Sequence, residues 1–233
     1  MIRKNIPNAL TCGNLLCGCI GIIEAFHSNL LLSCVLIGIA LIFDFLDGFI
    51  ARLLKVSSPI GRDLDSLADM VTFGVLPSVI VYQLLMQSIP DLYGIWKAYP
   101  ALIIAIFSAI RLAKFNNDPR QSDSFIGVPT PANALLIASL PIIVFQDESW
   151  KPLIVNTNNL LILTAVMSYL LVAEIKLIAL KFKSFGWGGN EFRYSFILLT
   201  ILLIAVFKVL AIPLILISYI ALSITANLVK KNA

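Results

Sequence analysis

Charged residues are scarce in this sequence of 233 residues: only 13% are Asp, Glu, Lys or Arg, while 59% are hydrophobic. Soluble domains usually carry about 25% charged residues. The mean hydropathy of +0.95 points the same way. An ordinary soluble domain is therefore excluded, and we predict an all-α, polytopic membrane protein.

Histidine is nearly absent, since His27 is the only one. This excludes transferases that use a His nucleophile in paired H-x-K motifs. The four cysteines all lie in apolar segments, and no histidine stands near Cys17 and Cys19. We therefore expect buried apolar cysteines rather than a zinc site or a disulfide. Internal repeats and low-complexity tracts are also missing, which favours a single integral-membrane domain over residues 1–233.

Apolar runs of membrane length divide the chain, because a helix needs about 20 such residues to cross a bilayer core. Residues 1–8 are short, basic and end in Pro7-Asn8, which predicts an interfacial segment. Eight spans are predicted after it, near 9–26, 30–53, 63–87, 99–114, 130–146, 159–181, 194–207 and 210–229. The span at 99–114 is short. Lys208 and Pro213 mark either a turn between two spans or a kink in one.

Lysine and arginine predict the orientation, because they are enriched in cytoplasmic loops. With eight spans and the N-terminus inside, 14 of the 17 Lys and Arg residues fall on the inner side. The three on the outer side are Lys97, Lys151 and Lys208. This bias predicts that both termini and the turn at 53–62 are cytoplasmic.

The most unusual stretch runs from Asp44 to Asp69 and reads DFLDGFIARLLKVSSPIGRDLDSLAD. Its first half places five residues at i, i+3, i+4, i+7 and i+8, which share one face of a helix. These residues are Asp44, Asp47, Gly48, Ala51 and Arg52. The face combines two carboxylates and a cation with two small residues, which let a ligand or another backbone approach closely.

Pro59 and Gly61 break this helix, and Asp65 and Asp69 share a face of the next. If the two helices are antiparallel, four carboxylates meet near one end of the pair. Four carboxylates cannot stay ionised together without cations. Their hard oxygen ligands favour Mg2+, Mn2+ or Ca2+ over zinc, and four carboxylates suffice for a two-metal site.

The same stretch fits, without departure, the signature D-x2-D-G-x2-A-R-x8-G-x3-D-x3-D. The chain thereby resembles the CDP-alcohol phosphatidyltransferase family, and the resemblance extends over residues 1–181. It implies a catalytic unit of six transmembrane helices, with residues 194–229 as an additional C-terminal helix pair. It also implies a homodimer with one active site in each protomer.

The family transfers a phosphatidyl group from a CDP-linked lipid to an alcohol and releases CMP. The resemblance assigns the metal ions, Mg2+ or Mn2+ and two in number, to Asp44, Asp47, Asp65 and Asp69. It makes Asp69 the general base for the incoming hydroxyl. It assigns the CDP-lipid to Asn8, Gly48, Arg52, Ser58 and Gly61. Helix capping is the alternative role for Asn8 and Ser58.

Two later stretches resemble the phosphatidylserine synthase branch of this family. Residues 110–116 read IRLAKFN, with Lys114 in place of a second arginine, and residues 127–134 read GVPTPANA. This resemblance implies CDP-diacylglycerol and L-serine as substrates. Arg111 is the candidate for the serine carboxylate, because its fork pairs bidentately with one. Asn116 and Thr130 are candidate polar contacts. A cation at a cytoplasmic helix end is the alternative reading of Arg111.

Two other functions stay open. A sibling enzyme would use glycerol 3-phosphate or an inositol phosphate, for which a denser basic pocket is expected. A transporter or channel would line a pathway near the bilayer midplane with its carboxylates. The positive-inside bias favours an active site at the cytoplasmic face of the cell (inner) membrane. Membrane lipids are expected partners, and nucleic acid is not.

Overall fold

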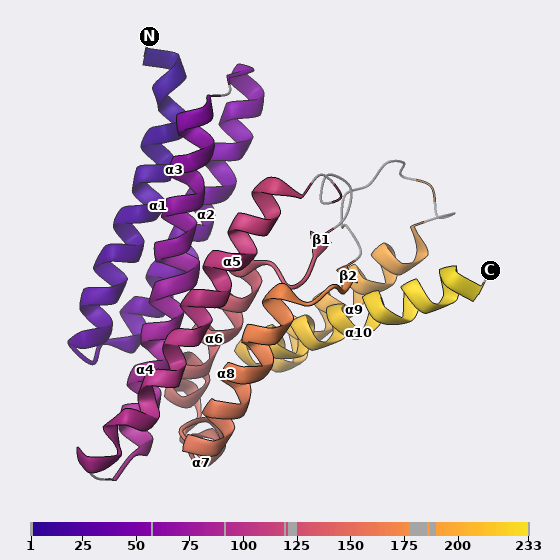
Figure 1. Cartoon of the computed structure of the whole chain (residues 1–233). Helices are drawn as coiled ribbons and strands as arrows, with labels where there is room; N and C mark the ends of the chain where they lie inside the picture. The colour runs from indigo at the N-terminus through magenta and orange to yellow at the C-terminus, as the bar shows by residue number, and fades with distance from the viewer. Residues whose placement is uncertain are drawn as a thin grey trace.

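Long helices make up almost all of the chain that the computed structural model describes, namely residues 2–56, 58–90, 92–118, 120, 125–177, 186 and 190–232. The first two, α1 (Ile2–Phe26) and α2 (Leu30–Leu54), form an antiparallel hairpin (Figure 1). Asn29 caps α2 through its side chain, which accepts a hydrogen bond from the backbone of Leu32.

The predicted interfacial segment is not a separate element. Residues 2–8 continue into the first span as one helix, with Pro7 inside it. Pro7 lies near the start of α1, where few backbone hydrogen bonds depend on it, so the helix is not broken.

The signature continues from α2 into a second long helical run. Lys55, in the left-handed conformation with φ 52°, ends α2. The next run joins α3 (Pro59–Asp69), the π-helix η1 (Met70–Val75) and α4 (Leu76–Ser88) over 30 residues. It begins four residues before the predicted span at 63–87, because Ser58 caps α3 and Pro59 suits a first helical position.

Two predicted span boundaries are wrong. The span expected at 99–114 begins earlier, because the 3-10 helix η2 (Leu92–Leu102) leads directly into α5 (Ile103–Asn117). The span expected at 159–181 ends earlier, because α8 (Thr157–Val172) stops where Ala173 becomes extended. The strand β2 (Lys176–Leu177) then pairs antiparallel with β1 (Phe125–Ile126). Residues 178–181 lie outside the described part of the chain.

Between these strands the chain forms α6 (Thr130–Gln146), the 3-10 turn η4 (Glu148–Trp150) and α7 (Lys151–Ile154). The helical segment ending at Ile154 meets α8 at an angle of 68°, as in a broken span or a re-entrant loop.

The C-terminal region is a helical hairpin of α9 (Glu191–Phe207), η5 (Lys208–Leu210) and α10 (Ala211–Asn232). The ring centroids of Phe196 and Tyr219 lie 5.3 Å apart, although a continuous helix would separate these residues by about 34 Å. The region is therefore two helices rather than one kinked helix. The chain reverses around Lys208, which has a φ of 50°, and the hairpin leans away from the bundle (Figure 1).

Among the described residues, five helical stretches are long and apolar enough to cross a membrane, and counting the bent pair as one span gives six. They are 5–26, 30–54, 59–88, 93–117 and 191–225, the last of which contains the hairpin turn at Lys208, and 148–172 is the bent pair. The helix α6 is apolar but has only 17 residues. The chain is thus an all-α, polytopic membrane protein, while the number of eight spans stays a prediction.

Side chains from several helices fill the core of the bundle, among them Ile37, Phe73, Leu76, Ile104 and Ile137, all fully buried. Close approach of α1 to the second run depends on Gly18, where an added Cβ would lie 3.0 Å from the Cα of Thr72. Large apolar side chains such as Phe45, Leu198 and Val206 remain exposed, as expected for helices that face lipid.

Candidate active site

Three carboxylates converge where α2 passes α3. Asp44 and Asp47 come from α2, Asp65 comes from α3, and one oxygen of each lies within 4.8 Å of the others. Asp47 is buried, and Oδ1 of Asp65 is a buried atom without a hydrogen-bond partner. Three like charges at this distance repel one another and leave oxygen lone pairs unused. The set therefore fits a hard divalent cation, which takes carboxylate oxygens as ligands.

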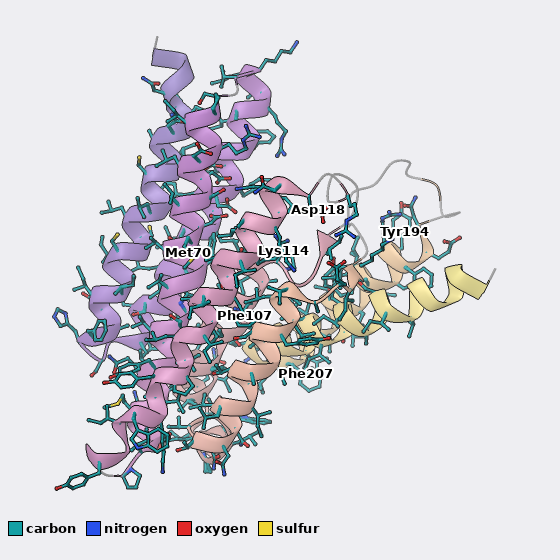
Figure 2. The ribbon with its side chains drawn as sticks, in the orientation of Figure 1. Met70, Phe107, Lys114, Asp118, Tyr194 and Phe207 are labelled. Carbon is teal, nitrogen blue, oxygen red and sulfur yellow. The ribbon has the colours of Figure 1, made fainter. Side chains whose placement is uncertain are left out.

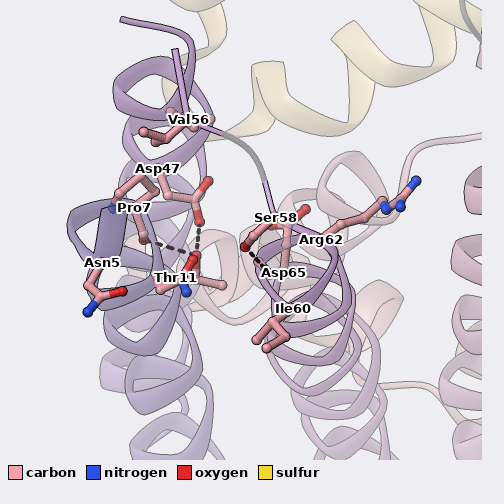
Figure 3. Close-up of a pocket in the computed structure, with 13 residues that line it drawn as sticks. Asn5, Pro7, Thr11, Asp47, Val56, Ser58, Ile60, Arg62 and Asp65 are labelled. Atoms are coloured by element: carbon pink, nitrogen blue, oxygen red, sulfur yellow. Dashed lines mark hydrogen bonds between the residues drawn. The ribbon is translucent and has the colours of Figure 1, made fainter. Parts of the chain in front are cut away.

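A cavity of about 450 Å³ opens beside the cluster, between α1, the end of α2 and the start of α3 (Figure 3). This volume is in the usual range for a small-ligand site. Four residues assigned to the CDP-lipid line it, Asn8, Gly48, Ser58 and Gly61, together with Asp47 and Asp65. Arg62 also lines the cavity, but its side chain points away from Asp47 and Asp65 in Figure 3.

The two glycines of the signature make room in different ways. An added Cβ at Gly48 would meet nothing within 4 Å, so open space lies next to this position. At Gly61 it would lie 3.0 Å from both Oδ1 of Asn8 and Oγ of Ser58. Gly61 therefore lets α1 and the turn before α3 come together at the cavity.

Ser58 serves as the helix cap that was the alternative to a ligand role. Its Oγ accepts a hydrogen bond of 3.0 Å from the backbone nitrogen of Gly61, while the residue also lines the cavity. Asn8 lies inside α1, so it is not a cap. Arg52 is exposed at the end of α2 and is not among the described residues that line the cavity.

Thr11 is a site residue that the sequence did not reveal. Its hydroxyl lies 2.6 Å from Oδ2 of Asp47 and 3.1 Å from the carbonyl oxygen of Pro7 (Figure 3). Because the ionised carboxylate can only accept, the Thr11 hydroxyl donates to it. In the sequence, Thr11 is a single threonine in an apolar helix. This pattern does not indicate that its partner is Asp47, 36 residues away.

Asp69 occupies a different environment from the other three. It is the last residue of α3 and is buried, and among the described residues the carboxylates that converge do not include it. Its Oδ1 accepts a hydrogen bond of 3.0 Å from Nδ2 of Asn14 on α1. Asp69 is thus held by a hydrogen bond from α1, while its charge still interacts with those of Asp44, Asp65 and Asp47.

The π-helix η1 begins directly after Asp69. Such insertions are rare and often occur at functional sites, because they change the direction of the side chains that follow. Gly74 in this segment packs closely on α5, since an added Cβ would lie 3.0 Å from the Cβ of Ser108.

The three residues assigned to serine have different surroundings. The exposed Asn116 donates from Nδ2 to Oγ of Ser66 at 2.7 Å, which joins α5 to α3. Thr130 is buried in the first turn of α6. Arg111 is 4% exposed, and its Nε donates to the carbonyl oxygen of Val128 at 3.3 Å. Its guanidinium also lies over the ring of Phe115, 4.9 Å from the centroid.

Arg111 lines a second cavity of about 120 Å³, which shares no described lining residue with the first. The other charged side chains around it are Lys114, Asp118, Arg120 and Glu174. Lys114 and Asp118 lie at the end of α5 nearest the β1 and β2 strands (Figure 2). The cavity therefore combines cations with carboxylates.

Arg120 joins two sides of this second cavity. It forms an ion pair of 2.7 Å with Asp118 and another of 3.5 Å with Glu174. The hydrogen bond to Asp118, followed by the charges of Asp118 and Glu174, raises the pKa of Arg120 above its ordinary value. All three side chains are partly or largely exposed to solvent, so the two ion pairs add little to the stability of the fold. Their importance for the cavity is that they place both positive and negative charge around it.

The register of α5 indicates how far Arg111 lies from Asp69. Asn116 contacts Ser66, and Ser108 packs on Gly74, so α5 runs antiparallel to the second run. At 1.5 Å per residue, Arg111 lies about 4.5 Å beyond Ser108 and Asp69 about 7 Å beyond Gly74 along the same direction. Arg111 and Asp69 are therefore within about one helical turn of each other along the bundle axis.

Comparison with known proteins identifies a family whose profile covers this site. The sequence profile described as CDP-alcohol phosphatidyltransferase matches residues 4–173, which include all four acidic residues of the signature and Arg111. A match over most of the chain shows membership, so the protein belongs to the CDP-alcohol phosphatidyltransferase family. The matched region ends before α9 and α10.

Among its relatives is the CDP-diacylglycerol–serine O-phosphatidyltransferase of Bacillus subtilis, 35% identical over 171 residues, which are 73% of this chain and 88% of the relative. The protein of the same name from Helicobacter pylori strain J99 is 35% identical over 210 residues, 88% of this chain and 84% of the relative. One from Methanocaldococcus jannaschii is 36% identical over 118 residues, 51% of this chain and 54% of the relative.

Proposed function

We propose that this protein transfers the phosphatidyl group of CDP-diacylglycerol to the hydroxyl of L-serine, giving phosphatidylserine and CMP. The observation that carries the proposal is the convergence of Asp44, Asp47 and Asp65 beside a cavity of about 450 Å³. The names of the relatives from several species support serine as the acceptor.

The cavity beside the cluster is the proposed site of the CDP moiety. Asn8 and Ser58 offer polar contacts there, and Gly48 leaves space for the nucleotide. Among the described lining residues, Arg62 is the one cation, whereas Asp47 and Asp65 are anions. A pyrophosphate would be repelled by these carboxylates unless cations stood between them. Arg52, although exposed in the described chain, is proposed to contact the CDP moiety at the rim.

Asp44, Asp47 and Asp65 are the proposed metal ligands, with Asp69 as a fourth at the edge of the group. Two Mg2+ or Mn2+ ions are proposed, and when bound they neutralise the charge of the pyrophosphate and of the departing CMP. The unpartnered Oδ1 of Asp65 is the atom that best fits this role, because a buried carboxylate oxygen without a donor is otherwise unfavourable.

Asp69 is the proposed general base. The serine hydroxyl oxygen attacks the phosphorus that bears the diacylglycerol, and its proton passes to the Asp69 carboxylate. The new oxygen–phosphorus bond forms as the bond to the bridging oxygen breaks, and that oxygen leaves with CMP. The hydrogen bond from Asn14 supports this role, because it holds one oxygen of the Asp69 carboxylate in a defined position.

The second cavity is the proposed site for the rest of the serine molecule. The hydrogen bond of Arg111 to Val128 uses Nε of the guanidinium. The two terminal nitrogens of the guanidinium are proposed to bind the serine carboxylate. Asp118 and Glu174 supply negative charge that suits an ammonium group. Acceptors such as glycerol 3-phosphate carry no ammonium, so mixed charge favours an amino acid over them. Asn116 and Thr130 remain proposed polar contacts near this acceptor.

The location and assembly are part of the same proposal. The enzyme would lie in the cell (inner) membrane with its active site and both termini on the cytoplasmic side, because lysine and arginine gather there. Residues 1–181 would form the catalytic unit and residues 194–229 an added pair. A homodimer is proposed from the family resemblance. Mass measurement of the detergent-solubilised protein tests it, and a fully active monomer would contradict it.

The test of the activity is CMP release by the purified protein in vesicles containing CDP-diacylglycerol. Serine, glycerol 3-phosphate and inositol phosphate are supplied in parallel, each with Mg2+ or Mn2+ and with a chelator. We expect metal-dependent release of CMP with serine and none with glycerol 3-phosphate or inositol phosphate. Release with a phosphorylated acceptor instead would identify a sibling enzyme. Metal-dependent ion flux without CMP release would favour the transporter.

A further inference from the structure

The residue that holds Asp69 is Asn14, which lies outside the signature. Asn14 is fully buried in the middle of α1, and its Nδ2 donates to Oδ1 of Asp69 at 3.0 Å. Because an ionised carboxylate has no hydrogen to donate, the amide must turn its nitrogen towards Asp69. One oxygen of the proposed base therefore has a defined partner from another helix.

The backbone around Asn14 is itself tied to the helix that carries Asp69. The hydroxyl of Thr72 lies 3.1 Å from the carbonyl oxygen of Asn14, to which it donates. One turn further along α1, Gly18 packs directly on the backbone of Thr72. The amide of Asn14 and the carboxylate of Asp69 thus belong to two segments in fixed contact, as a precisely oriented catalytic group requires.

Stability alone does not explain an asparagine at this position. Its Oδ1 is buried and has no hydrogen-bond partner, which is unfavourable for folding. An apolar side chain of similar size would remove this unpaired atom. A buried polar atom without a hydrogen-bond partner is expected mainly at functional sites, where the cost to stability serves the function.

We propose that Asn14 is a positioning residue that acts through Asp69. By holding Oδ1, it sets the rotation of the carboxylate and leaves Oδ2 to receive the proton of the incoming hydroxyl. This inference rests on the proposed phosphatidyl transfer with Asp69 as the base.

The experiment compares the full-length wild type with Asn14→Leu and Asn14→Asp, each purified in detergent. The readouts are kcat, KM for serine, KM for CDP-diacylglycerol, and the midpoint of thermal unfolding. Asn14→Leu removes the donor and the unpaired oxygen together. Asn14→Asp keeps the size but replaces the donor with an acceptor.

We expect both variants to lower kcat by about tenfold to a hundredfold, the effect of losing a hydrogen bond to a charged group. KM for CDP-diacylglycerol should stay within about twofold, because the ligands of the nucleotide cavity are untouched. Asn14→Leu should unfold at the wild-type temperature or above. A purely structural role would instead lower the unfolding temperature and impair lipid binding together with turnover.

Ser33→Ala is the matched control for the packing of α1. The buried Ser33 donates to the carbonyl oxygen of Gly21 at 2.9 Å, so its loss loosens α1 far from the carboxylates. We expect its kcat to stay near that of the wild type. If Asn14→Leu does not fold, Asn14→Asp decides. Unchanged kcat in the folded variant overturns the inference, whereas an inactive wild type overturns the proposed function instead.

Discussion

Thr11 on α1 and Asp47 on α2 are joined by a hydrogen bond of 2.6 Å between side chains that are both buried. The bond holds one carboxylate of the proposed metal site from a helix that carries none of the signature. Partners of this kind orient metal ligands and raise their affinity for the ion. The helix α1 is therefore part of the site, and not merely a membrane anchor.

The first prediction concerns this bond. Thr11→Val keeps the shape of the side chain but removes the hydroxyl, so Asp47 loses its donor. We expect the metal concentration for half-maximal activity to rise about 10- to 100-fold, with activity recovering at high metal. Thr164→Val is the control, because its buried hydroxyl donates to the carbonyl oxygen of Leu160 within α8, outside the described lining of the first cavity. Equal effects of the two variants would contradict a role for Thr11 in metal binding.

The second prediction separates the roles of the carboxylates. Asparagine keeps a carbonyl oxygen but cannot accept a proton under these conditions. Asp69→Asn should therefore reduce kcat about 100- to 10,000-fold while metal-dependent CDP-lipid binding largely survives. Asp44→Asn or Asp47→Asn should weaken metal and CDP-lipid binding together.

Because the family resemblance also makes Asp69 a metal ligand, the contrast is one of degree. The measurement is CDP-lipid binding by each variant over a range of metal concentrations, together with its rate at saturating metal. If added metal alone restored Asp69→Asn to a nearly normal rate, Asp69 would be a ligand only, and the base would lie elsewhere.

The third prediction concerns the acceptor. Arg111→Ala should raise KM for serine about tenfold to a hundredfold, because a charge-assisted hydrogen bond is lost. KM for CDP-diacylglycerol should change much less. Arg111→Lys keeps the charge without the planar fork and should recover only part of the loss. Equal changes in both KM values would assign Arg111 to the structure or to the nucleotide.

The fourth prediction concerns the packing of α1. An added Cβ at Gly18 would lie 3.0 Å from the backbone Cα of Thr72, so Gly18→Ala must push α1 away from η1. Overpacking of this kind destabilises by about 1–3 kcal/mol. The expected result is a lower temperature of thermal unfolding in detergent. Gly38→Ala is the control, because nothing lies within 4 Å of its Cβ and alanine favours the helix. A stable Gly18→Ala variant would mean that the contact is looser than described.

The fifth prediction concerns topology. The distribution of lysine and arginine predicts that the C-terminus is cytoplasmic. A reporter that is active only in the cytoplasm, fused after Ala233, should therefore be active. A second fusion in the turn at 53–62 should agree with it. Activity only from a periplasmic reporter would mean that the predicted number of spans is wrong.

Helix boundaries show where sequence patterns stop being sufficient. The apolar run that continues past Val172 predicts a longer helix, yet the chain turns extended there and pairs with Phe125 and Ile126. That pairing involves residues about 50 positions apart, so no local pattern can predict it. The π-helix after Asp69 is equally hidden, because its sequence is compatible with an ordinary helix.

The sequence by itself determined the membrane class, the helical fold and the family, because hydropathy and the spacing of Asp44, Asp47, Asp65 and Asp69 are local properties of the chain. Only the tertiary structure decided that three of these carboxylates converge and that the fourth is held by Asn14, 55 residues away. It also decided that Arg111 lines a cavity apart from Asn116. The physical reason is that helical periodicity fixes which residues share a face, whereas the distance between faces depends on how small residues such as Gly18 and Gly74 let whole helices pack.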